Sequence, residues 1–202
     1  MKKSILLRSI ALSVFTLGII AVTVQCATPN LSSRAIEFNE NGENGLIVGS
    51  ITFPTLQPRF TSYSISFTSL NGETKTSKIF IEPEWERKIS HNGELNNGKS
   101  YLFAVEKMPG KYAIDKIVCS ATGYENTKYY DKVEDFAIPF EVKKGEIVYI
   151  GEILFDEYAT EKPALKNLQS NYKRDMEGLA LRQPSIDWTK AKKSSFELNK
   201  TN

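Results

Sequence analysis

The sequence has few of the residues on which metal and nucleophilic sites depend: one histidine and two cysteines among 202 residues. A structural zinc site takes four Cys or His ligands, so these residues do not suffice for one. A Ser-His-Asp site would have to use His91. That histidine lies between Ser90 and Asn92-Gly93, residues typical of turns, so we expect it in a solvated loop without a catalytic role.

The chain also lacks the short motifs that mark phosphate, calcium and acyl-transfer sites. It contains no glycine-rich phosphate loop, no nucleophile elbow and no calcium loop of the Asp-x-Asp-x-Asp-Gly kind. Glu82, Glu84 and Glu86 alternate around Pro83 and Trp85, which leaves a hard-cation site open as an alternative. The prediction is a chain with no catalytic residues, no cofactor and no metal site, and therefore not an enzyme.

A large excess of charge of one sign is missing as well. The 26 Lys and Arg residues face 24 Asp and Glu, a formal net charge of +2. Lys2, Lys3 and Arg8 fall in an amino-terminal segment that we expect to be removed, which leaves 23 of the 26 basic residues and a net charge of −1. A nucleic-acid partner, which a strongly basic surface would indicate, is therefore not expected.

The amino terminus has the pattern of an export signal, which we place at residues 1–25. Residues 1–8 carry three positive charges and no acid, and residues 10–24 form a nearly unbroken apolar run. A membrane-spanning helix needs roughly 20 apolar residues, and this run is shorter. The run ends at Thr23-Val24-Gln25-Cys26.

A cysteine directly after such a run resembles the signal of bacterial lipoproteins, in which the thiol is linked to diacylglycerol and becomes the first mature residue. Thr23 and Gln25 stand where that signal usually has Leu and a small residue, a relaxation that occurs in spirochaetes. The resemblance implies a lipidated Cys26 and a bacterial cell-envelope protein, held by its lipid at the outer membrane or cell surface rather than the inner membrane. Cleavage near Ala27 and a retained anchor stay open as alternatives.

Composition divides the rest of the chain. Residues 26–44 mix Pro, Ser, Asn, Glu and Gly, with Ile36 and Phe38 as candidate anchors, and this composition predicts a flexible tether. The tail after Trp188 is polar and is expected to fray, and contact of its basic residues with anionic lipid is the alternative. The predicted parts are a β-sandwich over 45–156, a helical segment over 157–189 and the tail over 190–202.

Period-two alternation is the main signal from residue 46 to residue 155. Tyr63, Ile65 and Phe67 alternate with serine and threonine, so one face of that strand is apolar and the other hydroxylic. Pro139 confines its strand to an edge or a bulge, because proline cannot donate to the ladder. The predicted fold class is mainly β: an antiparallel Greek-key sandwich of about seven strands with a C-terminal α-helix packed on it. These strands cover residues 46–53, 62–68, 75–81, 101–106, 111–120, 136–143 and 146–155, with a long loop at 82–97.

Two of these runs depart from simple alternation. The parity of the apolar residues changes between Ile114 and Ile117, so a bulge near Asp115-Lys116 would turn both inward. Cys119 follows on the same parity as Ile117, and we expect a buried core thiol there. Residues 147–150 are apolar on both parities, so both faces of that strand should be covered.

A helical stripe is expected downstream to supply this cover. Apolar residues recur at spacings of three and four over residues 163–181, with charged residues off the stripe. Pro163 would lie in the first turn of the helix, and Gln183-Pro184 would end it. The stripe consists of Leu165, Leu168, Tyr172, Met176 and Leu179.

Three turns in the second half of the sandwich carry a family resemblance. In order they are Met108-Pro109-Gly110-Lys111-Tyr112, Ser120-Ala121-Thr122-Gly123-Tyr124 and Lys143-Lys144-Gly145-Glu146, the last leading into an apolar strand. This order resembles the carboxypeptidase regulatory-like, or prealbumin-like, β-sandwich. Together with the export signal, it is similar to bacterial lipoproteins that carry such a domain. The resemblance implies an appended, non-catalytic domain, and the Tyr-Arg-Gly-Ser signature of the related hydroxyisourate hydrolases has no match here.

Two functions fit these features. The first is a membrane-tethered binding module whose loops contact another envelope or extracellular macromolecule through Trp85, Tyr129 and Tyr130, because exposed aromatic side chains supply contact area at low entropic cost. The alternative is a structural envelope-assembly component without a free ligand. A helical stripe buried on its own sheet together with exposed aromatics favours binding, and an exposed stripe favours assembly.

Overall fold

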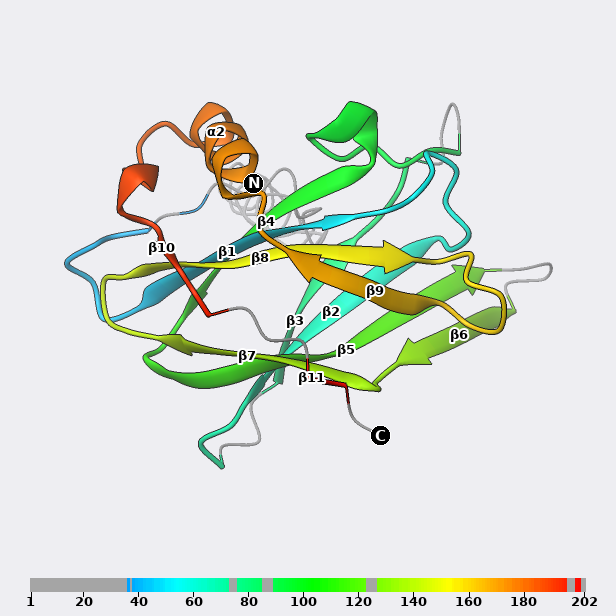
Figure 1. Ribbon diagram of the computed structural model, residues 1–202, viewed down its shortest axis with the longest axis horizontal. Coiled ribbons are helices and arrows are strands. Elements are labelled where there is room, and N and C mark those ends of the chain that lie inside the picture. The colour runs from blue at the N-terminus through cyan, green and yellow to red at the C-terminus, as the bar shows by residue number, and fades with distance from the viewer. Residues whose placement is uncertain are drawn as a thin grey trace, which may run out of the picture.

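Two β-sheets pack face to face in the computed structural model, which describes residues 36, 38–72, 76–84, 89–122, 127–195 and 199–200 (Figure 1). Sheet A contains β1 (Gly45–Thr52), β4 (Ser100–Lys107), β8 (Ile147–Asp156), β9 (Ala164–Gln169) and β10 (Lys192–Lys193). Sheet B contains β2 (Ser62–Ser69), β3 (Thr76–Ile81), β5 (Gly110–Thr122), β6 (Lys128–Val133), β7 (Phe136–Val142) and β11 (Asn199–Lys200). The described residues also form the helix α2 (Tyr172–Arg182) and the 3-10 turns η3 (Asn96–Gly98) and η5 (Trp188–Lys190).

The mainly β class and the C-terminal helix are confirmed, and each of the seven predicted strands is present. Sheet A is mixed, however, because β1 runs antiparallel to β4 and parallel to β8. The expectation of a wholly antiparallel sandwich is wrong at this pair. Parallel neighbours need a crossover connection, and here β2 to β7 lie between them in the sequence.

Residues 164–169 form the strand β9, where a helix was predicted. Leu165 and Leu168 pack against the core between the sheets, and β9 pairs antiparallel with the end of β8. Helical spacing predicted the wrong element because a bulge breaks the alternation of this strand. Phe155 lies opposite Leu165 and Leu154 lies opposite Asn167, so Lys166 has no partner in the ladder and both leucines turn inward. The open edge of β8 offers the backbone hydrogen bonds of the new strand. The tail also contains paired residues, since β10 pairs with β8 and β11 pairs with β7.

The bulge predicted in the fifth strand is confirmed at Asp115. Ser66 of β2 lies opposite Lys116 and Phe67 lies opposite Ile114, so Asp115 has no partner in this ladder. The extra residue restores the side-chain alternation, and Ile114, Ile117 and Cys119 are all fully buried.

The core consists of two layers that share β1 and β8. Between the sheets, Ile47 and Val148 pack with the inner faces of sheet B. On the outer face of sheet A, Tyr149 packs under α2 together with Met176 and Leu179. Both faces of β8 are therefore covered, as predicted, and the part of the apolar stripe that is helical is buried on its own sheet.

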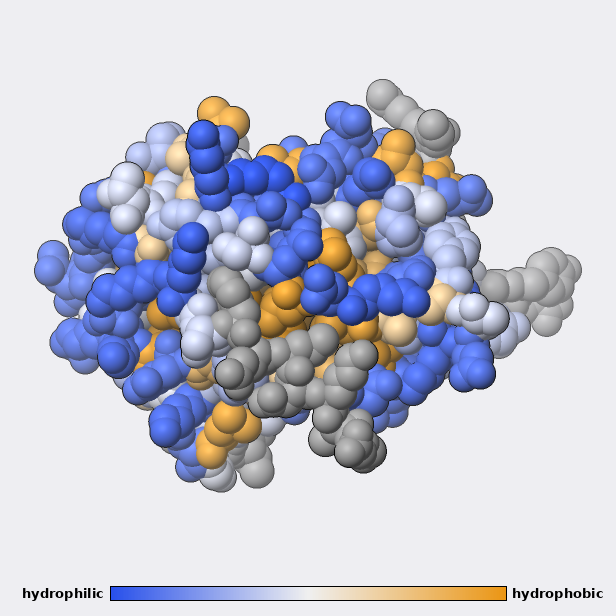
Figure 2. All heavy atoms as spheres, in the orientation of Figure 1, coloured by the Kyte–Doolittle hydropathy of each residue, from blue (hydrophilic) through white to orange (hydrophobic). Residues whose placement is uncertain are grey.

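The described end of the segment assigned to the tether contacts the folded body. Ile36 and Phe38 pack against the cluster beneath α2, and the Ile36 amide donates to Gln183 Oε1 over 3.0 Å. Within the part of the chain that the structure describes, no helix has the length and apolarity that a membrane span requires. Figure 2 shows a mostly hydrophilic surface, with apolar side chains gathered in the middle of the view between β9 and β7.

Candidate functional site

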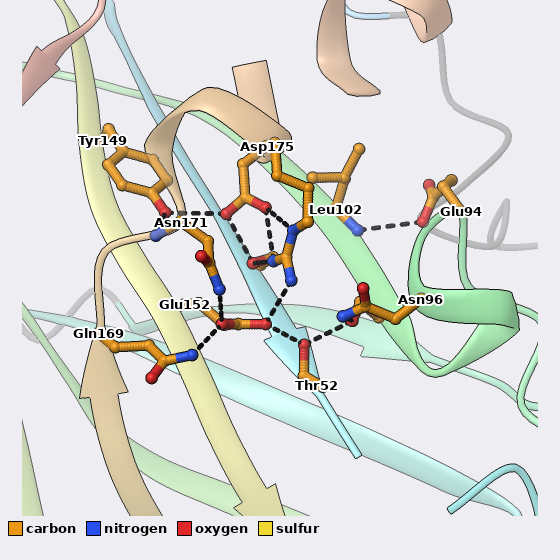
Figure 3. A network of polar contacts seen from close by, with 12 residues as sticks. Thr52, Glu94, Asn96, Leu102, Tyr149, Glu152, Gln169, Asn171 and Asp175 are labelled. Carbon is orange, nitrogen blue, oxygen red and sulfur yellow. Dashed lines mark hydrogen bonds and ion pairs between the residues drawn. The ribbon is translucent and has the colours of Figure 1, made fainter. Parts of the chain in front are cut away.

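A buried ionic network joins the start of α2 to the outer face of sheet A (Figure 3). Glu152 comes from the centre of β8 and Asp175 from the first turn of α2, and both carboxylates are buried. Arg174 bridges them: its Nη1 lies 2.8 Å from Glu152 Oε1, and its Nη2 lies 2.6 Å from Asp175 Oδ1. Two anions and one cation thus share a site from which most water is excluded.

Neutral donors complete the coordination of both carboxylates. Glu152 accepts hydrogen bonds from Gln169, over 2.6 Å, and also from Thr52 and Asn171. Burial alone would raise the pKa of Glu152, but the hydrogen bonds from Thr52, Gln169 and Arg174 outweigh burial and hold this pKa below its ordinary value. The network therefore stabilises Glu152 in its charged form.

The carboxyl group of Asp175 has the opposite balance. Its Oδ2 accepts from Ser50 over 2.7 Å and from Tyr149 over 2.9 Å. Burial raises the pKa of Asp175, and the hydrogen bonds from Ser50, Arg174 and Tyr149 only partly oppose this effect. Keeping both carboxyl groups ionised beside Arg174 therefore costs more free energy than keeping a single carboxylate ionised in a simple ion pair.

A shallow hollow of about 570 Å³ lies beside this network at the start of α2. Arg174 forms part of its wall, but the guanidinium already donates to Asp175 through Nε and Nη2, to Ser50 through Nη2 and to Glu152 through Nη1. All three nitrogens are thus used within the chain. The arrangement fixes the helix on the sheet and offers the hollow no free guanidinium nitrogen.

His91 is part of a second buried cluster, at one end of the sandwich. Its Nε2 lies 3.0 Å from Glu157 Oε1, its Nδ1 lies 3.2 Å from the Tyr101 hydroxyl, and its ring stacks on Phe53 at a centroid distance of 4.0 Å. The expectation of a solvated histidine is wrong. The turn residues around it do form a loop, but the His91 amide donates to Leu56 O over 2.7 Å and the loop folds over the end of the core.

The distance between His91 and Glu157 is that of the histidine–carboxylate pair of a catalytic triad, but the surroundings of the pair differ from those of an active site. Glu157 Oε2 also accepts from the Tyr63 hydroxyl and, over 2.7 Å, from the Arg59 amide. Burial is the main cause that raises the pKa of Tyr63, and the nearby charge of Glu157 raises this pKa further. The side chains of both His91 and Glu157 have no exposed surface, so a substrate has no access to them in this conformation. The cluster can close the end of the sandwich by hydrogen bonding.

The described residues contain no group of three or more His, Cys, Asp or Glu side chains placed to hold a metal ion. Cys119 is a free, fully buried thiol, as predicted, and burial raises its pKa. A low-pKa, accessible thiolate is what a reactive cysteine needs, and Cys119 has neither property.

The residues predicted to contact a partner fall into two groups. Cys26 and Trp85 lie outside the described residues. Tyr129 and Tyr130 lie on the strand β6 rather than in a loop, and their exposed fractions are 59% and 57%. Because successive side chains of a strand point to opposite faces, the two tyrosines cannot contribute to one patch through the same face.

Tyr130 lies on the outer face of sheet B, which we call the hydroxyl face after its five central side chains. The alternate residues of β2, such as Tyr63 and Ile65, point into the core, so its serines point outward. Figure 1 shows α2 on the side of sheet A away from sheet B, and no described helix or strand packs over the hydroxyl face. The five side chains are Ser62, Ser64, Ser66, Ser120 and Thr122.

Strand register places aromatic side chains on both sides of this surface. Ser64 lies opposite Phe80 of β3, and Ser120 lies opposite Tyr130 of β6. Phe80 has 46% of its surface exposed. The sequence signal for this residue was its parity, opposite to that of the buried Ile79 and Ile81, but its place beside the serines depends on pairing that the sequence does not state.

No protein-family model and no curated protein sequence matches the chain. Among solved structures, a leucine-rich repeat protein from Bacteroides thetaiotaomicron is similar at 9% sequence identity with a TM-score of 0.33. The match covers 69% of this chain and 16% of that protein's chain, so this chain spans a small part of its length. A likeness at this level carries no conclusion about function.

Proposed function

We propose that the protein is a lipid-anchored component of a bacterial cell envelope whose β-sandwich acts as a non-catalytic binding module. The localisation rests on the sequence: a basic start, an apolar run and Cys26 directly after it. The binding role rests on one structural observation, the hydroxyl face, which carries exposed aromatic side chains and no described covering element.

The buried helical stripe favours binding over the assembly alternative. Met176 and Leu179 are covered by sheet A, so α2 has no apolar stripe left over for docking onto a larger complex. Both buried polar clusters are engaged within the chain, which supports a structural role for them. Phe80 and Tyr130 stay exposed on the opposite side of the molecule.

The family proposed for the sandwich is the carboxypeptidase regulatory-like module with a seven-stranded Greek-key arrangement. Its support is the placement of the turns from which the resemblance came. Pro109 and Gly110 lie where β4 passes into β5, and Ala121-Thr122 ends β5. Gly145 lies between β7 and β8 with a φ of 68°, the left-handed conformation that such a tight turn uses.

Photo-crosslinking in living cells tests the binding role. A benzophenone amino acid replaces Tyr130 or Phe80 in the full chain, and the matched control replaces Tyr129, which is equally exposed on the same strand but points to the other face. The proposal expects a slower-migrating adduct from positions 130 and 80 and much less from 129. Adducts of equal yield at all three positions, or at none, would contradict it.

Lipidation is tested separately by fractionation and mass spectrometry. We expect the wild-type chain in the membrane fraction, with an acylated amino-terminal peptide beginning at Cys26. The Cys26→Ser variant should lose both the modification and the membrane association. An unmodified wild-type peptide in the soluble fraction would rule out the anchor without bearing on the binding surface.

A further inference from the structure

We propose that the hydroxyl face binds an acidic polysaccharide, an inference that rests on the proposed binding function and names the partner's chemistry. The ligand we infer is an extended chain of sugar rings carrying carboxylate groups. Its rings would stack on the two aromatic side chains, its hydroxyls would bond to the central serines, and its carboxylates would meet the surrounding lysines.

The hydroxyl face is regular because it is built from paired strands. One row crosses four strands as Phe80, Ser64, Val118 and Lys132. The next row contains Ser62, Ser120 and Tyr130. Short side chains in the middle leave a flat floor, and long ones stand at its two sides.

Strand geometry gives the separation of the two aromatic side chains. Three strand spacings and one row lie between Phe80 and Tyr130, which corresponds to about 16 Å at ~4.8 Å per strand and ~6.7 Å per row. A compact small molecule cannot touch both, whereas several rings of an extended sugar chain can. Aromatic rings held by a sheet lose little entropy on binding, which suits them to stacking on the apolar faces of sugar rings.

The charge of the hydroxyl face favours an acidic polysaccharide over a neutral one. Lys78, Lys128 and Lys132 form no ion pair among the described residues, while Lys116 pairs with Glu134 over 2.6 Å. Among the acids of this face, Asp115 accepts a hydrogen bond from Thr68. The hydroxyl face thus carries several lysines, although the protein as a whole is close to neutral. Such a positively charged surface is complementary to a polyanion.

Ser66 provides a second, independent observation at the centre of this face. Its hydroxyl is buried and has no hydrogen-bond partner among the described residues. Lys78 and Lys116 stand on either side of it in the adjoining strands. A buried hydroxyl without a partner is costly, and a ligand carboxylate held by these two lysines would supply the missing acceptor.

The test measures binding of the purified full chain to three probes: polygalacturonate, neutral dextran, and vesicles containing phosphatidylglycerol. We expect saturable binding to polygalacturonate that weakens as salt is added, and at least about tenfold weaker binding to dextran. Tyr130→Ala and Phe80→Ala should each weaken polygalacturonate binding about tenfold, because truncated aromatic anchors carry effects of this size. Lys132→Gln should weaken binding and also reduce its salt dependence.

The matched control is Tyr129→Ala, which removes an equally exposed tyrosine from the same strand and should leave the affinity unchanged. No binding to polygalacturonate, or equal losses in Tyr129→Ala and Tyr130→Ala, overturns the inference. Binding to the vesicles alone also overturns it and assigns the lysines to a lipid surface. If photo-crosslinking still gives adducts at positions 130 and 80, the binding function stands and only the ligand class fails.

Discussion

Replacing Arg174 with alanine removes the cation that joins the buried carboxylates of Glu152 and Asp175. Removing one partner of a buried ion pair costs about 3–5 kcal/mol, because the remaining charge stays desolvated. The side chain of Arg174 is 25% exposed, so solvent screens part of the effect and we expect the lower end, about 3 kcal/mol. For a domain of this size that loss corresponds to a fall in Tm of roughly 6–12 °C.

The pH dependence separates an electrostatic origin from lost packing. In the wild type the lowered pKa of Glu152 contributes stability that is present above the pKa of the unfolded state and is lost as the pH falls through the folded value. Without Arg174 the pKa of both carboxyl groups rises, and protonation in mild acid relieves the penalty. The difference in unfolding free energy between wild type and Arg174→Ala should therefore shrink from pH 7.5 to pH 4.5.

Urea denaturation of the full chain, followed by circular dichroism at both pH values, measures this difference. The matched control is Lys173→Ala, one residue earlier on the same helical turn, with a side chain 90% exposed. Lys173 forms only a surface ion pair with Glu177, at 3.9 Å. The unfolding free energy of Lys173→Ala should therefore stay within about 0.5 kcal/mol of the wild-type value at either pH. A loss for Arg174→Ala below about 1 kcal/mol, or one that is the same at both pH values, would refute the role assigned to the network.

Three further predictions concern other parts of the fold. Glu157→Gln should lower the unfolding free energy by about 2–3 kcal/mol in urea denaturation, because an amide cannot accept all the bonds that the carboxylate accepts; a neutral result would show that this cluster is not stabilising. In the Cys26→Ser background, Cys119 should stay unreactive toward a thiol reagent until urea unfolds the chain, and native-state labelling would contradict its burial. Gly145→Ala should lower the Tm more than Gly72→Ala in thermal melting. Both glycines have a positive φ, but only at Gly145 would a Cβ meet a backbone atom, Glu40 O at 2.2 Å. Equal falls in Tm would count against that contact.

The strands and the bulge could be predicted because their signals are local. Alternation over six to ten residues identifies which side chains of a strand are buried, and a change of parity between Ile114 and Ile117 locates the extra residue. The same approach gave the wrong element at residues 164–169. Leu165 and Leu168 satisfy a helical stripe, but the pairing partner that makes β9 a strand is β8, which periodicity cannot identify.

The two buried polar clusters and the hydroxyl face were harder to predict from the sequence, because they depend on contacts between residues far apart in the chain. Glu157 meets His91 across 66 positions of sequence, so the turn residues around His91 predicted its loop correctly and its burial wrongly. Tyr130 was singled out for its aromatic character, but Phe80 was not. Their shared face follows from the registers of β2, β3, β5 and β6, none of which a single sequence specifies.

The buried polar clusters and the hydroxyl face are connected through rigidity. Each cluster joins a segment outside the sandwich to β8 or its end: Arg174 ties α2 to Glu152, and His91 ties its loop to Glu157. Such networks satisfy their hydrogen bonds in one arrangement only, so they restrict sheet A to a single position relative to α2 and the loop. Sheet B packs on the other side of this fixed layer through the shared core. A flat surface held in this way loses little conformational entropy when a ligand binds, so Arg174→Ala should weaken binding at the hydroxyl face even under conditions in which the domain stays folded.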